Sequence, residues 1–249
     1  MKIDVAFLPK DITQNDLSHT VCVVLDIFRA TTSIVTAMAN GCQTIMPVIS
    51  LEQAHEIAGQ SGPVLLAGER QSIKIDGFDF GNSPFEFSRD KVENQQIVMT
   101  TTNGTIAIQA TQGACCTLIG AFINAEAVIR QLQPYEQDVL IVCAGTDRMF
   151  SLEDSLCAGL LVDLLASKHP VQLNDSARGA QIMYTAAKNH LMEVVIDSRN
   201  GQRLIQLGKK AEIEYCVRKS IVNIVPEYKE NRIILDNKDT VVKYTEFLR

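Results

Sequence analysis

The sequence predicts an α/β fold of three layers, in which helices cover both faces of a mixed, mainly parallel sheet. Short apolar segments rich in β-branched residues alternate along the chain with segments whose apolar residues recur at helical spacing. The clearest apolar segment, 21–25, reads VCVVL, which is typical of a strand buried on both faces. Strands that alternate with helices pair in parallel through right-handed crossovers.

Taken in order, the expected elements account for most of the chain. Strands are predicted from apolar runs at 3–7, 21–25, 44–49, 64–67, 97–99, 117–119, 138–143, 221–225 and 232–235. Helices are predicted from helical periodicity at 34–38, 51–58, 106 onward, 125–132, 155–166, 177–188, 202–207 and 211–219. Thr31, Thr32 and Ser33 are expected to cap the helix over 34–38, and Asn40-Gly41 to end it.

The segment 71–89 shows neither helical nor strand periodicity, and it is rich in turn residues. A loop of this length in a compact domain is usually functional or disordered. Its four phenylalanines favour ordered packing: Phe78, Phe80, Phe85 and Phe87. The 249 residues suit a single domain, with two α/β lobes of about 1–125 and 126–249 that meet at the site as the alternative arrangement.

The charge and the amino-acid composition of the chain exclude some classes of binding partner. A formal net charge of −6 and a pI near 5.3 argue against non-specific binding to nucleic acid or to an anionic membrane. No apolar run reaches the roughly 18 residues of a membrane-spanning helix, and the first ten residues lack the apolar region of a signal peptide. Seven cysteines without zinc spacing are typical of reduced thiols. We expect a cytoplasmic homo-oligomer, a dimer, that binds a small molecule.

Polar side chains follow four predicted strands, at 26–33, 68–70, 100–105 and 144–154. The carboxyl ends of parallel strands share one edge of a sheet, where ligands bind. The acids of this group that end apolar strands are Asp26 and Glu69, and a lone buried carboxylate costs several kcal/mol without a cation beside it. The arginines that follow them, Arg29 and Arg70, either bind a ligand or only pair with the acids. Asp26, Arg29 and Glu69 are the predicted catalytic residues.

Two turns are candidates for an anion cradle, because helix N-termini carry free N–H groups. They comprise Thr31, Thr32 and Ser33, and Asn103, Gly104 and Thr105. Simpler interpretations stay open, since Thr105 and Ser151 also read as helix N-caps and Asn103-Gly104 as a plain turn. The four histidines lie away from these loops in the sequence, so histidine catalysis is not expected.

Three common phosphatase or phosphate-binding signatures are missing in their usual form. The residue two after Asp26 is Phe28, so the DxD of haloacid-dehalogenase-type phosphatases is not formed. Cysteine phosphatases need an arginine six residues after the cysteine, and Met149 holds that position after Cys143. The phosphate loop GxxxxGK[ST] does not occur.

With these residues in view, the chain resembles the 2-phosphosulfolactate phosphatase family. The matching stretches are VVLDIFRATTSIVTAMANG, LLAGERQSIKIDGFDFGNSPFEF, TTTNGTIAI, CAGTDRMFSLEDSLCAG and, more weakly, EIEYCVRKSIVNIVP. Together they cover most of the chain in the expected order. The resemblance implies Mg²⁺-dependent hydrolysis of a phosphate monoester on a sulfonated hydroxy acid, which gives 3-sulfolactate, a step of coenzyme M biosynthesis in methanogens.

Such a substrate carries phosphate, carboxylate and sulfonate, so Mg²⁺ and arginine forks would offset its charge. Magnesium prefers one or two carboxylates besides water and phosphate oxygens. Asp26 and Glu69 are the first candidates for metal ligands, with Glu153, Asp154 or Asp79 as alternates. The candidates for substrate binding, besides the two cradle turns, are Arg70 and, toward the sulfonate, Lys74 and Arg178. Attack on phosphorus by Asp26 and attack by water both stay open.

Two other classes of function remain as alternatives. An anion-binding α/β protein without turnover would gain nothing from paired carboxylates unless a metal were bound. A mutase or lyase acting on phosphorylated acids would use a similar site, and the identity of its product would distinguish it.

Overall fold

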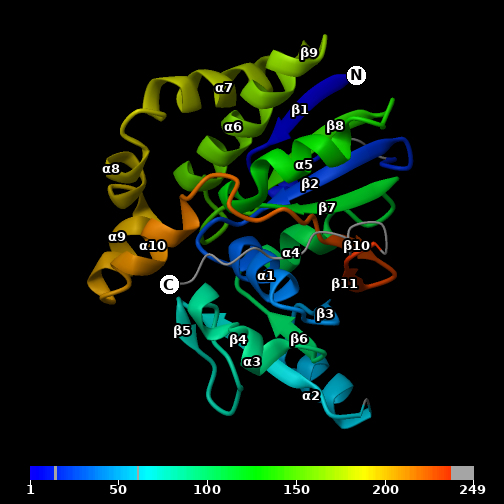
Figure 1. Ribbon diagram of the computed structural model, residues 1–249, viewed down its shortest axis with the longest axis vertical. Helices are drawn as coiled ribbons and strands as arrows, with labels where there is room; N and C mark the ends of the chain where they lie inside the picture. Colours follow the sequence, from blue (N-terminus) through cyan, green and yellow to red (C-terminus); the bar gives the residue numbers. More distant parts are fainter. Residues whose placement is uncertain (14–15, 61, 237–249) are drawn as a thin grey trace.

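The computed structural model describes residues 1–13, 16–60 and 62–236, and it has the predicted α/β architecture (Figure 1). Within the described residues, eleven strands form one sheet: β1 (Lys2–Ala6), β2 (Thr20–Leu25), β3 (Thr44–Pro47), β4 (Leu65–Arg70), β5 (Ile73–Lys74), β6 (Gln96–Thr100), β7 (Cys116–Gly120), β8 (Asp138–Cys143), β9 (Gln172–Leu173), β10 (Glu227–Lys229) and β11 (Arg232–Ile234). The helices are α1 (Ala30–Ala39), α2 (Leu51–Gln60), α3 (Arg89–Val92), α4 (Gly104–Gln109), α5 (Ala125–Leu132), α6 (Leu152–Lys168), α7 (Asp175–Ala187), α8 (Leu191–Ile196), α9 (Arg199–Gln206) and α10 (Lys210–Cys216).

The order of the strands is β5-β4-β6-β3-β11-β10-β7-β2-β8-β1-β9. The sheet contains two parallel groups, β4-β6-β3 and β7-β2-β8-β1-β9. The hairpin β10–β11 joins them through antiparallel pairings on both sides. Three successive antiparallel steps reverse the strand direction between the groups, so their carboxyl ends do not form one continuous edge. The ends of β2 and β6 meet because α4, which follows β6, packs against β2.

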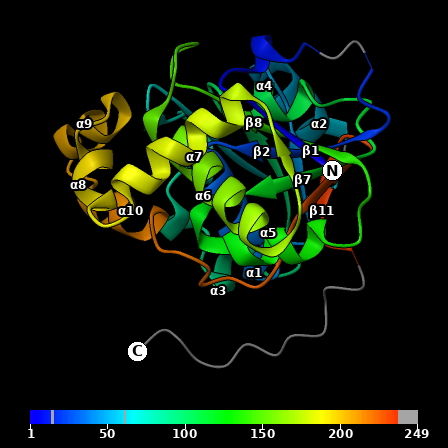
Figure 2. The ribbon, with the colours of Figure 1, turned by 90° about the horizontal axis from the view of Figure 1, so that it is seen from above.

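Helices cover both faces of the sheet (Figure 2). In this view α2 and α4 lie on one side of the strands, and α1 and α5 lie on the other. The pair α6 and α7 packs against β8, β2 and β1. The short helices α8, α9 and α10 pack on one another at the end of the molecule (Figure 1). This arrangement matches the predicted three layers.

The core explains why the apolar runs of the sequence become central strands. Every residue of β2 is buried, as expected for a strand with neighbours on both sides and helices on both faces. Most residues of the neighbouring β7 and β8 are buried too. The edge strands β5 and β9 have only two residues each, and neither was predicted.

The prediction of a strand over 221–225 is wrong, because this segment forms no strand and the next strand of the sheet is β10. Backbone groups of this segment bond to other partners. Val222 N donates to Ile123 O at 2.8 Å, and the Ile224 carbonyl accepts from the Asn124 side chain at 3.1 Å. Pro226, which follows, has no N–H to donate to a ladder.

The loop over 71–89 is ordered around its aromatic residues, as predicted. Phe78, Phe80 and Phe87 are buried, and the rings of Phe80 and Phe87 lie 5.2 Å apart. Phe85 is exposed, and its ring packs against the ring of Tyr215 on α10.

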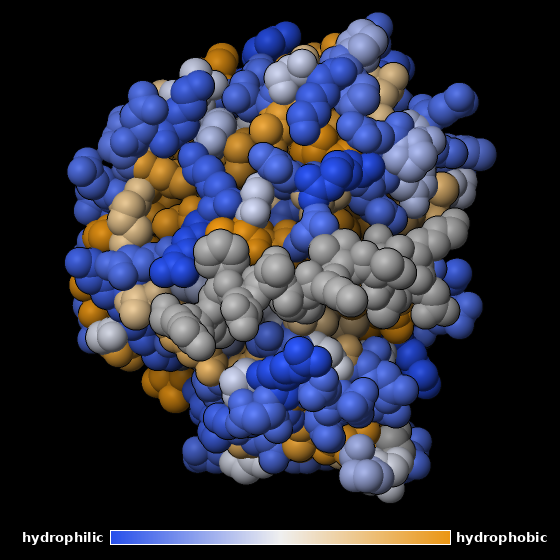
Figure 3. All heavy atoms as spheres, viewed as in Figure 1, coloured by the Kyte–Doolittle hydropathy of each residue, from blue (hydrophilic) through white to orange (hydrophobic). Residues whose placement is uncertain are grey.

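The face drawn in Figure 3 is mostly hydrophilic, with hydrophobic residues in smaller groups between the polar ones. In the part of the chain that the structure describes, no helix is long and apolar enough to cross a membrane.

Candidate active site

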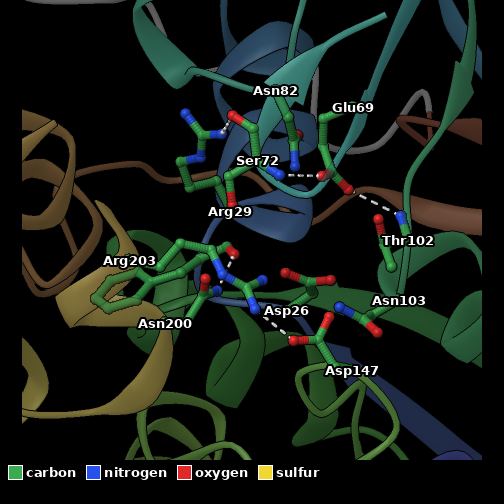
Figure 4. A pocket seen from close by; sticks show the side chains of 11 residues that line it. Asp26, Arg29, Glu69, Ser72, Asn82, Thr102, Asn103, Asp147, Asn200 and Arg203 are labelled. Atoms are coloured by element: carbon green, nitrogen blue, oxygen red, sulfur yellow. Dashed lines mark hydrogen bonds and ion pairs between the residues drawn. The ribbon is translucent and has the colours of Figure 1, made fainter. Parts of the chain in front are cut away.

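A polar pocket lies where the loops after β2, β4 and β6 meet the helix α9 (Figure 4). It holds about 320 Å³ of space not filled by atoms, and this figure includes space that is open to solvent. The residues that line it are Asp26, Phe28, Arg29, Glu69, Ser72, Asn82, Thr102, Asn103, Asp147, Asn200 and Arg203. The three predicted catalytic residues, Asp26, Arg29 and Glu69, are all among them.

Asp26 lies in the middle of this pocket, directly after β2 (Figure 4). Its Oδ1 accepts a hydrogen bond from Ala30 N at 3.2 Å, at the start of α1. Burial raises the pKa of Asp26 to about 7, and the nearby carboxylates of Glu69 and Glu153 also raise it, whereas the Ala30 N–H and Arg29 lower it. A carboxylate held in so anionic a setting would be stabilised by a cation.

Glu69, at the end of β4, uses both carboxylate oxygens to hold two loops. Oε2 accepts from Ser72 N at 2.7 Å, and Oε1 accepts from Thr102 N at 2.8 Å. Figure 4 shows both bonds, with the carboxylate beside the cavity. Each oxygen keeps a second lone pair, so Glu69 can still accept from, or coordinate, a ligand.

The two acids at the start of α6, Glu153 and Asp154, are buried but do not line the pocket. Asp154 accepts from Ile27 N at 2.8 Å and from Gly145 N at 3.1 Å, so it ties the loop after β2 to the loop after β8. Burial raises the pKa of both carboxyl groups. Ser151 is the predicted N-cap, since its side chain accepts from Asp154 N. This geometry indicates a structural function for Asp154.

Arg29 is almost completely buried, with 2% of its surface exposed, and follows a cis peptide bond with Phe28. Its guanidinium pairs with Glu212 of α10 and donates to the Ser72 carbonyl at 3.2 Å. Arg29 therefore connects the loop after β2 to the helical end of the chain. Lys209 also donates to the Ser72 carbonyl, at 3.1 Å, and its pKa is lowered by burial and by Arg29.

The prediction that the backbone amides of the two turns are free to cradle an anion is wrong for three of them. Thr31 N donates to the Asp26 carbonyl at 3.0 Å and Ser33 N to the Arg29 carbonyl at 2.9 Å. Thr105 N is bonded to Thr101 Oγ1 at 3.1 Å. These amides are already used to close the turns, so they are not open donors.

The hydroxyl residues after Asp26 do not cap α1, contrary to the prediction. The helix begins at Ala30, and its N-cap position is Arg29, without a side-chain bond. The hydroxyls instead donate to carbonyl oxygens: Thr31 to Asp26, Thr32 to Ile27 and Ser33 to Asn82. Thr105 likewise lies inside α4, whose N-cap position is Asn103.

Gly104, the first residue of α4, lies against Asp26. A Cβ at this position would lie 2.8 Å from Asp26 Oδ2 and 2.5 Å from the Cβ of Ala30. Asn103, one residue earlier, lines the pocket, as does Asp147 (Figure 4). The turn after β6 is thus placed against Asp26, as predicted, but by close contact of the backbone.

The structure does not bring four other candidates to the pocket. Arg70 donates to the Glu69 carbonyl and to Thr100 Oγ1. Lys74 is exposed on β5 and donates to the Asp79 carbonyl, and the Asp79 carboxylate accepts from Leu66 N. Arg178 is exposed on α7, where it donates to Gln181.

Seven of the residues that line the pocket were not predicted as site residues: Phe28, Ser72, Asn82, Thr102, Asp147, Asn200 and Arg203. Asn200 and Arg203 are three residues apart on α9, which places both on one face of the helix. Asn200 donates to the Phe28 carbonyl at 2.7 Å and so attaches α9 to the loop after β2. That spacing was readable in the sequence, but nothing there showed that α9 reaches the sheet.

Three buried side-chain oxygens that line the pocket have no hydrogen-bond partner among the described residues. They belong to Asn82, Thr102 and Asn200. Buried polar atoms are normally bonded, so unpaired ones around a cavity indicate that a ligand, ion or water completes them. Within residues 1–13, 16–60 and 62–236, no three His, Cys, Asp or Glu side chains lie close enough to hold a metal between them. Any metal here would have one or two carboxylate ligands.

These features define an α/β protein whose pocket combines carboxylates, arginines and unpaired oxygens, as a site for a polyanionic small molecule requires. The sequence profile of the 2-phosphosulpholactate phosphatase family matches residues 6–231. The chain belongs to this family.

Curated relatives agree with this assignment. The chain is 39% identical over 234 residues to a probable 2-phosphosulfolactate phosphatase of Clostridium tetani, covering 94% of this chain and all of the relative. It is 38% identical over 236 residues to one of Clostridium acetobutylicum, covering 94% of this chain and 100% of the relative. A third, of Clostridium kluyveri, is 39% identical over 229 residues, covering 92% of this chain and 95% of the relative.

Proposed function

We propose that this protein is a Mg²⁺-dependent phosphatase that hydrolyses 2-phospho-3-sulfolactate, or a closely related phosphorylated 2-hydroxy acid, to 3-sulfolactate and phosphate. Family membership makes it a phosphoric monoester hydrolase. The observation that carries the more specific proposal is the pocket around Asp26, which is lined by three acids, two arginines and three residues with unpaired oxygens. A neutral or cationic substrate would have no use for the arginines.

The donor set fits a magnesium ion. Magnesium takes one or two carboxylates and keeps several waters, which hydrogen-bond to nearby oxygens. Asp26 and Glu69 would hold the ion, and the unpaired oxygens of Asn82, Thr102 and Asn200 would accept from its waters. When bound, the ion would offset the charge of the phosphate and polarise its oxygens. The raised pKa of Asp26 agrees with this, because the carboxylate lacks a sufficient counter-charge in the protein alone.

The chain's own residues would place the substrate for attack. Asp26 lies in the pocket between the starts of α1 and α4, and the phosphate would bind next to it. It either attacks phosphorus or orients a water that does so. Arg29, fixed by Glu212 and the Ser72 carbonyl, supplies positive charge that does not need to reorganise during the reaction.

The deciding experiment measures phosphate release from a panel of phosphorylated hydroxy acids, with Mg²⁺ and with a chelator. We expect release from 2-phospho-3-sulfolactate that stops in the chelator and returns when Mg²⁺ is added. Equal rates in the chelator would contradict the metal proposal alone. Release from none of the substrates would contradict the phosphatase proposal and favour an anion-binding protein or another phosphate-handling enzyme.

Arg29→Lys tests the fixed arginine. Lysine keeps the charge but loses the planar fork that reaches Glu212 and the Ser72 carbonyl together. We expect kcat/KM to fall by about tenfold or more, the cost of a lost charge-assisted hydrogen bond. The measurement is steady-state phosphate release, with thermal unfolding followed in parallel. Arg130→Lys, an exposed arginine on α5, is the control. Wild-type activity in Arg29→Lys would leave Arg29 a structural function only.

A further inference from the structure

Arg203 differs from the other arginine of the pocket in how it is held. Arg29 is buried and its partner Glu212 is nearly so, with side-chain exposures of 2% and 11%. Arg203 pairs with Asp147, and their side chains are 31% and 40% exposed. An ion pair between partly exposed groups adds little to stability, so another anion can replace one member at low cost. Among the described residues that line the pocket, Arg203 is thus the cation most easily released to a ligand.

The position of this pair indicates which part of a ligand it meets. Asp147 and Arg203 line the pocket around Asp26, and they also line a wider outer hollow together with Gln71, Gln206 and Leu207. Asp26 does not border that hollow. A phosphate that reacts at Asp26 therefore lies on the inner side, and a second acidic group of the same molecule would extend toward Arg203.

Both members of the pair are held in place by their backbones. Asp147 has a φ of +54°, unusual for a residue other than glycine, within a turn closed by hydrogen bonds between Thr146 and Met149 at 2.8 and 3.0 Å. Asp154 holds the start of this turn through Gly145 N. Arg203 lies one helical turn after Asn200, which bonds to the Phe28 carbonyl. The carboxylate and the guanidinium thus meet at a defined point of the pocket wall (Figure 4).

We propose that Arg203 is a specificity residue that binds an acidic group of the substrate other than the phosphate, and that Asp147 occupies Arg203 until the substrate replaces it. This inference rests on the proposed function. An oxyanion of carboxylate or sulfonate type has the charge and lone pairs that the Asp147 carboxylate presents to the same guanidinium. Asp147 also repels anions that cannot bind Arg203 in exchange, which favours substrates with a second acid.

Binding measurements test this without depending on turnover. Calorimetric titration with 3-sulfolactate and, separately, with inorganic phosphate is carried out in Mg²⁺ on wild type and variants. In Arg203→Ala we expect affinity for 3-sulfolactate to fall about tenfold or more, and affinity for phosphate to change by less than about twofold. Arg203→Lys should recover part of the loss. Asp147→Asn removes the competing charge, so 3-sulfolactate should bind roughly threefold to tenfold more tightly.

Arg199 gives the matched control, since it is an exposed arginine on the same helix that does not line the pocket. Arg199→Ala should bind both ligands as wild type does, and circular dichroism should show that every variant is folded. Wild-type affinity of Arg203→Ala for 3-sulfolactate, or an equal loss of phosphate binding, would overturn the inference. So would a wild-type protein that does not bind 3-sulfolactate at all.

Kinetics with shortened substrates separate the two acidic groups. The loss of kcat/KM in Arg203→Ala is compared for 2-phospho-3-sulfolactate, 2-phospholactate, which lacks the sulfonate, and 2-phosphooxyethanesulfonate, which lacks the carboxylate. The substrate without the group that Arg203 binds should show almost no further loss. An equal loss with all three would assign Arg203 to the phosphate and overturn the inference. If the wild type binds 3-sulfolactate through Arg203 but releases no phosphate, the proposed function fails and this inference stands.

Discussion

Asp26→Asn is expected to lower phosphate release from 2-phospho-3-sulfolactate by at least about a hundredfold, since this is the usual effect of losing a catalytic carboxylate. Asparagine keeps the shape of the side chain and can still accept from Ala30 N. It removes the charge needed to attack phosphorus or to hold Mg²⁺. Asp163→Asn, on α6 and bonded to Gln181, is the control and should keep wild-type activity. Near-normal turnover in Asp26→Asn would exclude both functions of Asp26.

The same variant is expected to be more stable than the wild type in the absence of Mg²⁺. The pKa of Asp26 is about 7 in the folded protein, above its ordinary value of 3.8, so the protonated form is favoured by folding. This contribution is present at low pH and is lost as the pH rises from about 4 through 7. At pH 8, Asp26→Asn should therefore raise the free energy of unfolding by roughly 1–3 kcal/mol. Chemical unfolding at pH 5 and pH 8, with a chelator, measures this.

Stability that falls in Asp26→Asn at pH 8 would contradict this account of the burial of Asp26. Added Mg²⁺ should reverse the order, because it stabilises the wild-type carboxylate and has less to bind in the variant. Enzymes commonly have active sites that lower the stability of the free protein and are stabilised when the ligand binds. Here the cost comes first from the burial of the Asp26 carboxylate and then from the nearby carboxylates of Glu69 and Glu153.

The sequence predicted the fold well where hydrophobic pattern decides the structure. β2 and β8 are continuous apolar runs that can be buried only between neighbours and helices. It failed at 221–225, an apolar segment whose carbonyl and amide groups bond to Ile123 and Asn124 instead of a neighbouring strand. Those partners lie about a hundred positions away in the chain, as the separation between Asn124 and Ile224 shows, so local pattern could not reveal them.

The acidic residues of the candidate site could be predicted from the sequence, but the residues that α9 contributes to it could not. Asp26 and Glu69 could be found because each carboxylate follows an apolar strand. Burial of a carboxylate there is costly unless a cation or hydrogen bonds compensate for it. Asn200 and Arg203 lie on a short polar helix that reads as an ordinary surface helix. The contact that brings α9 to the site, from Asn200 to the Phe28 carbonyl, joins residues 172 positions apart. Charge alone is the basis for predicting Arg178 and Lys74 as site residues, and both are exposed outside the pocket.

Gly104→Val is expected to abolish activity, and Gly104→Ala to reduce it by about a hundredfold, the cost of displacing a reacting group by about 1 Å. The added Cβ would lie 2.5 Å from the Cβ of Ala30 and 2.8 Å from Asp26 Oδ2, closer than such atoms pack. Neither neighbour can move freely, since Ala30 begins α1 and its N–H holds the Asp26 carboxylate. The helix α4 must therefore shift away from Asp26, and the wall of the pocket beside the carboxylate changes. Overpacking of this kind should also cost about 1–3 kcal/mol of stability.

A second substitution separates the two clashes. Gly104→Ala combined with Ala30→Gly removes the contact between the two Cβ atoms but leaves the one with Asp26 Oδ2. We expect the double variant to regain most of the lost thermal stability and little of the lost kcat/KM. The control is Gly179→Ala on α7, where an added Cβ meets nothing within 4 Å. That variant should keep full activity and gain a little stability, because alanine favours helix more than glycine does. Wild-type kcat/KM in Gly104→Ala would show that the close approach of α4 to Asp26 is not needed for the reaction.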